Sequence, residues 1–166
     1  MLETADLIEA LGIFPTREKP RATLRPATLF STFFLGLLFV TVPLLVPWPI
    51  GQYLFGPVWV GFALLLDPLN YCLRGRSLLR DFETGRTSTF YSLLLAGLIC
   101  GIFWEFWNYW AAAKWVYVFP ILHGWKIFEM PLPGYLGFPP FAVECFVMYE
   151  FLRTLRGRFV SPRRRP

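Results

Sequence analysis

The sequence is poor in charge. Of its 166 residues, 16% are Asp, Glu, Lys or Arg, against about a quarter in ordinary soluble domains. In their place, 55% of the residues are apolar and 19% are aromatic. The length gives room for one domain, and this composition disfavours a soluble globular protein.

The chain also lacks the short motifs that mark common enzymes. It contains no glycine-rich phosphate loop, no His-Glu-x-x-His and no nucleophile elbow. Cys72, Cys100 and Cys145 follow no metal or redox spacing, so we interpret them as packing residues and predict no metal site and no cofactor. No cleavable signal peptide is expected, because the first apolar run is too long for one.

What the chain has instead is four apolar stretches. They cover residues Thr28–Val46, Tyr53–Leu73, Phe90–Trp110 and Phe138–Leu152. The first three have about 20 residues, the helix length that crosses a hydrocarbon core of roughly 30 Å. The fourth is shorter and is expected to span with the help of Arg153 and Arg156, whose side chains can snorkel. The sequence therefore predicts an all-α integral membrane protein with a four-span helical bundle over residues 28–154.

The basic residues are confined to three segments that this topology places on one side. Of the 16 Lys and Arg residues, only Lys114 and Lys126 fall in the opposite compartment. The positive-inside rule then predicts a cell (inner) membrane protein with both termini cytoplasmic. Residues 1–27 form its N-terminal segment and residues 155–166 a basic tail. Arginines scattered over three loops disfavour a nucleic-acid partner and leave membrane lipid as the expected one.

The N-terminal segment contains a predicted amphipathic helix over residues 2–14. Its apolar face consists of Leu7, Ile8 and Leu11, and acidic residues lie opposite. Two placements stay open: in the membrane interface, or docked on the arginine-rich loops of the same protein.

The second apolar stretch carries the sequence Asp67-Pro68-Leu69-Asn70. Spacings of three and four place Asp67 and Asn70 on one helix face. We expect Asp67 to meet Arg74, or another arginine of the same side, in a structural cap. Asp67, Asn70 and Arg74 then form an inner polar layer.

The third stretch places Gly97, Gly101, Glu105 and Asn108 on one face. The two glycines allow another helix to approach closely, so Glu105 is expected to point into the bundle. Glu105 lies five residues before the outer end of its stretch, and Glu144 six or seven residues inside the fourth. These depths predict an outer polar layer of Glu105, Asn108 and Glu144, with Asp67 roughly 15 Å deeper.

Residues 111–137 are rich in Pro, Gly and aromatic side chains. We predict a non-cytoplasmic cap of irregular backbone, either re-entrant or interfacial. His123, Lys126 and Glu129 on this cap are expected to close the outer layer.

Two interpretations of the outer layer stay open. In the first, Glu105 and Glu144 are catalytic, one of them is protonated near neutral pH, and it protonates a double bond of an apolar isoprenoid or lipid. The predicted substrate-binding residues are Trp104, Trp107, Asn108, Tyr109, Trp110, Trp115, His123 and Glu129. In the second, the protein is a non-catalytic subunit that binds lipid or pigment, as a homo-oligomer or in a larger membrane complex.

A family resemblance supports the first interpretation. It is carried by Asp67-Pro68, by Lys114-Trp115-Val116-Tyr117, and by the two proline-rich runs Met130–Pro133 and Phe138–Phe141 followed by Glu144. In these residues the chain resembles membrane carotenoid (lycopene) cyclase domains, and it is otherwise similar to bacterial polytopic membrane proteins of unassigned function. The resemblance implies a helical membrane enzyme that closes rings by proton-initiated cyclisation, with Glu144 at the acid position and Asp67 in support. Phe141-Ala142-Val143 replaces the paired acidic residues of that family.

Overall fold

The computed structural model describes residues 1–16, 23–118 and 125–160. Its helices are α1 (Leu2–Ala10), α2 (Pro26–Leu45), α3 (Trp48–Gly51), α4 (Phe55–Cys72), α5 (Leu78–Glu83), α6 (Ser88–Trp110) and α7 (Phe138–Val160). Two short strands, β1 (Lys126–Ile127) and β2 (Met130–Pro131), precede the 3-10 helix η1 (Leu132–Gly137). The prediction of an all-α protein is confirmed.

The four apolar stretches form the four long helices. Of these, α2 and α6 are long and apolar enough to cross a membrane, with mean hydropathies of 2.1 and 1.6. The fourth stretch was predicted too short, because α7 continues through the first part of the expected tail to Val160. Arginine and leucine are good helix formers and no proline intervenes there, so nothing ends the helix at Leu152.

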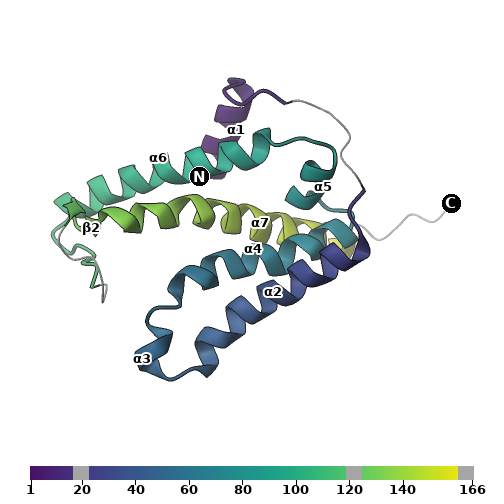
Figure 1. Ribbon diagram of the computed structural model, residues 1–166. Helices are drawn as coiled ribbons and strands as arrows, with labels where there is room; N and C mark the ends of the chain where they lie inside the picture. Colours follow the sequence, from purple (N-terminus) through teal and green to yellow (C-terminus); the bar gives the residue numbers. More distant parts are fainter. Residues whose placement is uncertain (17–22, 119–124, 161–166) are drawn as a thin grey trace.

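The long helices follow one another in the order α2, α4, α7 and α6, and α1 lies on α6 (Figure 1). Helix α2 is an edge element that packs mainly on α4, at a very close crossing. A Cβ atom added to Gly36 would lie 2.3 Å from the backbone nitrogen of Leu65, so only glycine fits there. The outer surface of α2 stays exposed and apolar.

The predicted close approach at Gly97 and Gly101 is confirmed. An added Cβ would lie 2.4 Å from the carbonyl oxygen of Phe138 at Gly97, and 2.2 Å from the Phe138 ring at Gly101. The start of α7 is therefore level with these two glycines, well inside the length of α6. This offset determines which polar groups of the two helices can meet.

Helix α1 differs from its prediction in length and face. It ends at Ala10, and Gly12 follows with φ +66°. Leu7 and Leu11 belong to the predicted apolar face but are 59% and 65% exposed, whereas Ala5 and Ile8 are buried. Ala5 and Ile8 therefore form the face that packs into the core, and Leu7 and Leu11 lie outside it.

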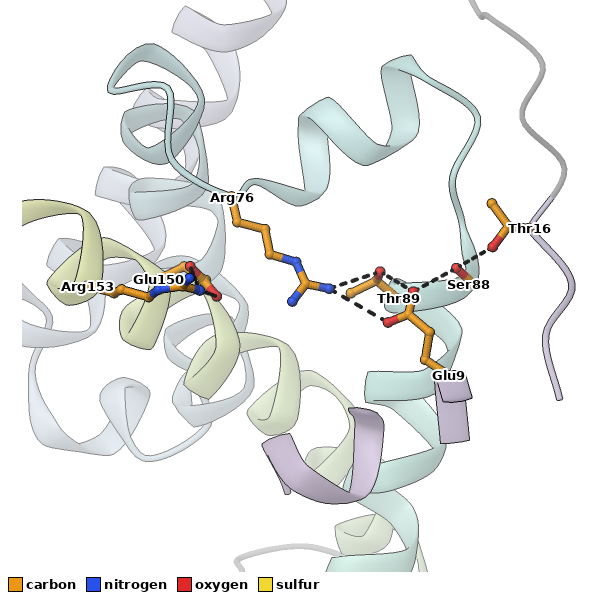
Figure 2. A network of polar contacts seen from close by, with 7 residues as sticks. All are labelled: Glu9, Thr16, Arg76, Ser88, Thr89, Glu150 and Arg153. Atoms are coloured by element: carbon orange, nitrogen blue, oxygen red, sulfur yellow. Dashed lines mark hydrogen bonds and ion pairs between the residues drawn. The ribbon is translucent and has the colours of Figure 1, made fainter. Parts of the chain in front are cut away.

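Of the two placements left open for α1, the structure shows docking on the chain itself. The Glu9 carboxylate accepts hydrogen bonds of 3.1 Å from the Ser88 and Thr89 hydroxyls and lies 3.7 Å from the Arg76 guanidinium (Figure 2). Arg76 lies in the loop between α4 and α5, and Ser88 and Thr89 are the first two residues of α6. Glu9 thus ties α1 to two other elements.

Candidate functional site

The site lies where α6 ends, which we call the aromatic end. The segment after α6, the β1–β2 hairpin and η1 cover it. The backbone here was predicted to be irregular, and residues 126–137 instead form this hairpin and 3-10 helix. Phe128 in the hairpin turn adopts φ +57° and its ring packs against those of Phe106 and Tyr109. These ring contacts hold the hairpin on α6.

Glu105 is the buried acid of this end. Its side chain is inaccessible to solvent, as predicted from the glycine face of α6. The Tyr117 hydroxyl donates a 2.5 Å hydrogen bond to Oε1. The other oxygen, Oε2, has no hydrogen-bond partner among the described residues. The one feature of the sequence that points to this pairing is the tyrosine in the short run 114–117.

Two tyrosines around Glu105 are held in their protonated form. Burial, and then the hydrogen bond to Glu105, raise the pKa of Tyr117 far above its usual range. Burial and the nearby Glu105 charge raise the pKa of Tyr135 to about 12. The Tyr135 hydroxyl donates to the Ile127 carbonyl oxygen at 3.0 Å and braces the hairpin. Tyr117 is therefore the hydroxyl donor that serves Glu105.

A cavity of about 380 Å³ opens beside this pair. It is lined by Trp59, Trp104, Trp115, Tyr117, Met130, Gly134, Gly137, Phe138 and Phe141. The walls are aromatic and apolar, and Tyr117 both lines the cavity and donates a hydrogen bond to Glu105. A volume above about 300 Å³ with mainly aromatic walls and one convergent polar group is typical of a small-molecule site.

The other predicted binding residues act in different ways. Trp104 and Trp115 line the cavity as expected. The Asn108 amide donates to the Trp115 carbonyl at 2.8 Å and accepts from its N–H at 2.6 Å, which fixes the chain that returns after α6. Asn108 therefore positions a wall of the cavity rather than lining it.

The remaining predicted residues lie around the cavity or outside it. The Glu129 carboxylate pairs with the Lys114 ammonium at 2.5 Å, and Lys114 lies over the Tyr109 ring. The hydrogen bond to Glu129 raises the pKa of Lys114. Trp107 and Trp110 are exposed and take no part in the walls. His123 lies outside the described residues.

Glu144 does not belong to the outer layer, so that prediction is wrong. Glu144 lies six residues past Phe138, which is about 9 Å along α7 toward the basic residues of the opposite end. Glu105 lies on the other side of the contact with Phe138, four to eight residues beyond Gly101 and Gly97 toward the end of α6. The two carboxylates are thus separated by roughly 15–20 Å along the helices at 1.5 Å per residue. The error arose from placing the start of α7 level with the end of α6. Glu144 is buried, and its Oε2 has no partner among the described residues.

The inner layer is structural, and Arg74 is not part of it. The Asp67 carboxylate accepts hydrogen bonds from the backbone N–H groups of Leu78 at 3.0 Å and Leu79 at 2.8 Å, and from the Ser77 hydroxyl at 3.1 Å. Asp67 thus caps the start of α5, whose free N–H groups attract a carboxylate better than a distant arginine does. Asn70 donates to the Val147 carbonyl at 3.0 Å and joins α4 to α7.

Comparison with protein-family models, with curated proteins and with solved structures gave no match to this chain. The resemblance to carotenoid cyclase domains therefore stays a prediction from the residues alone.

Metal chemistry has no evident donor set in the described residues, which hold no cluster of three or more His, Cys, Asp or Glu. Within those residues the three cysteines are free thiols. What the site offers is one buried carboxyl, one phenol that donates to it, and an aromatic cavity. This arrangement suits an apolar ligand with a single polar or proton-accepting point.

Proposed function

We propose that the chain is a cell (inner) membrane protein with four spans, α2, α4, α6 and α7, and with both termini cytoplasmic. The helix lengths of 18 to 23 residues support this, because about 20 residues cross a hydrocarbon core. The wide apolar surface of α2 is a second support, since lipid would cover it. The basic residues of the loops at the opposite end from the cavity are the third.

We further propose that the cavity at the aromatic end binds one apolar ligand, an isoprenoid or a lipid chain. The observation that carries this is the double role of Tyr117, which forms part of the cavity wall and donates to the buried Glu105. A ligand in the cavity would lie along the Trp104 and Trp115 side chains with Tyr117 at its polar point. Such an arrangement binds a chain and orients it.

Acid-catalysed isomerisation or cyclisation of that ligand is the second candidate. It is favoured by the Glu105 Oε2 atom, which is buried without a partner among the described residues. A proton on the Glu105–Tyr117 pair would be available at the cavity wall, and the aromatic faces would stabilise a cation formed on the ligand. Of the two acids predicted to be catalytic, Glu105 is the one at this site, because Glu144 is too far away.

Mass spectrometry of lipids bound to the protein after extraction in mild detergent tests the binding proposal. The wild-type protein is expected to retain one isoprenoid or lipid. Trp115→Ala should reduce its occupancy roughly tenfold, because a lost aromatic contact costs about 1–2 kcal/mol. Trp107→Ala is the matched control, since Trp107 is 68% exposed against 66% for Trp115 but lies outside the cavity. Equal loss in both variants, or no bound ligand in the wild type, contradicts the proposal.

The same measurement separates binding from catalysis. Glu105→Gln keeps the shape of the side chain but removes the acid. If the protein is an enzyme, this variant should accumulate a ligand that differs in structure from the one the wild type retains. An identical ligand in both proteins favours binding alone. Release of the protein from membranes by alkaline carbonate would contradict the membrane assignment itself.

A further inference from the structure

A second apolar hollow lies at the opposite end of the helix row, which we call the basic end. It is a groove of about 420 Å³ between the start of α2 and the end of α4, which lie side by side (Figure 1). Its walls include Pro26, Phe30 and Phe33 of α2 and Pro68, Leu69 and Cys72 of α4. The groove is almost wholly apolar, and its volume suits part of a hydrocarbon chain.

Several arginines at the basic end have structural partners. Arg80 donates to the Tyr71 and Gly75 carbonyls, and Arg158 donates to the Leu73 carbonyl. Figure 2 shows Arg76 paired with Glu9, and Arg153 with Glu150. Arg76, Arg80 and Arg158 join elements or complete the ends of helices, and Arg153 pairs with a glutamate of its own helix, so the fold itself explains these four side chains.

Arg25 and Arg74 are different. Both are exposed, and in the described part of the chain neither side chain forms a hydrogen bond or an ion pair. Arg25 directly precedes Pro26 in one wall of the groove, and Arg74 lies two residues beyond Cys72 in the other. Each wall of the groove therefore continues into an arginine that has no partner among the described residues.

The backbone at Arg74 gives an independent reason to think that its charge is used. Arg74 has φ +57°, just past the end of α4, where the Gly75 N–H closes the helix on the Asn70 carbonyl at 2.9 Å. Glycine is the favoured residue at this position, because a Cβ atom destabilises the left-handed conformation. The chain carries an arginine here although glycine would fit better and no contact of the described fold requires the side chain.

We propose that this groove binds an anionic phospholipid of the cytoplasmic leaflet, with an acyl chain along the groove and the phosphate between Arg25 and Arg74. Guanidinium groups bind phosphate through paired N–H donors, which explains the residue type. The inference relies on the membrane assignment proposed above, and it is independent of the cavity at the aromatic end.

Native mass spectrometry of the full chain tests this, after exchange into micelles with equal amounts of phosphatidylglycerol and phosphatidylcholine of the same acyl chains. The wild type should retain one phosphatidylglycerol in preference to phosphatidylcholine. Arg74→Gly and Arg25→Ala should each lower that preference about fivefold, the effect of one arginine at a membrane surface. Arg74→Gly should not lower the thermal stability, because it relieves the left-handed conformation, so misfolding cannot explain the loss.

Two further variants complete the test. Arg156→Ala removes another exposed arginine at the same end, away from the groove, and should leave the preference unchanged. Cys72→Trp fills the groove and should reduce retention of either lipid. If Arg156→Ala has the same effect as Arg74→Gly, the attraction is diffuse surface charge and the proposed site is wrong. Equal retention of both lipids by the wild type also overturns the proposed site. Release of the wild-type protein from membranes by alkaline carbonate would instead refute the membrane assignment.

Discussion

Tyr117→Phe isolates the contact on which the candidate site depends. The substitution removes one hydroxyl and leaves the ring in the cavity wall. Glu105 then loses the hydroxyl that donates to its Oε1, while its Oε2 has no hydrogen-bond partner among the described residues. A hydrogen bond to a charged group contributes about 1.5–3 kcal/mol, and one to a neutral group about 0.5–1.5 kcal/mol. For a chain of this size, the larger values correspond to a fall in Tm of about 3–12 °C.

Thermal unfolding in mild detergent measures the fall in Tm. The proteins compared are the wild type, Tyr117→Phe, Glu105→Gln and the double variant. Removal of the hydroxyl should cost about half as much in the Glu105→Gln background, because glutamine accepts a weaker hydrogen bond. Tyr109→Phe is the matched control, since Tyr109 lies at the same end of α6 and its hydroxyl forms no hydrogen bond within the described residues. The reasoning fails if Tyr117→Phe destabilises no more than Tyr109→Phe, or equally in both backgrounds.

Two more predictions concern the fold. Gly36→Ala should destabilise the protein by about 1–3 kcal/mol, the usual effect of overpacking, because the added Cβ would lie 2.3 Å from the Leu65 backbone nitrogen. The control is Gly56→Ala, which should not lower Tm because nothing lies within 4 Å of the added Cβ. Burial raises the pKa of Asp81, so the folded state holds its proton more tightly than the unfolded state. This contribution to stability is present at acidic pH and is lost as pH rises through the ordinary aspartate range and above. Asp81→Asn should therefore raise Tm near neutral pH and flatten its dependence between about pH 4 and 8; a steeper dependence in the variant would contradict this.

The helices were predictable because their signals are local. A run of about 20 apolar residues forms a helix whatever packs against it, and the four long helices start within two residues of the predicted stretches. The burial of Glu105 was also predictable, since it shares a face with Gly97 and Gly101, and a glycine face is where another element approaches. The hydrogen-bond partners were not predictable, because each depends on the offset between elements far apart in the sequence.

Glu144 and Asp67 show this limit most clearly. Counting residues inward from the outer end of each stretch places Glu144 level with Glu105. The contact of Phe138 with Gly97 and Gly101 instead places the start of α7 several helical turns before the end of α6. Asp67 was predicted to pair with an arginine because of its charge, but its carboxylate accepts hydrogen bonds from the backbone N–H groups at the start of α5. The sequence by itself determined the helices, the burial of their acids and the basic character of one end. Only the tertiary structure decided that Tyr117 donates to Glu105 and that the helix ends next to Arg25 and Arg74 line one groove. Both depend on the offset between helices, which is set by how their side chains pack.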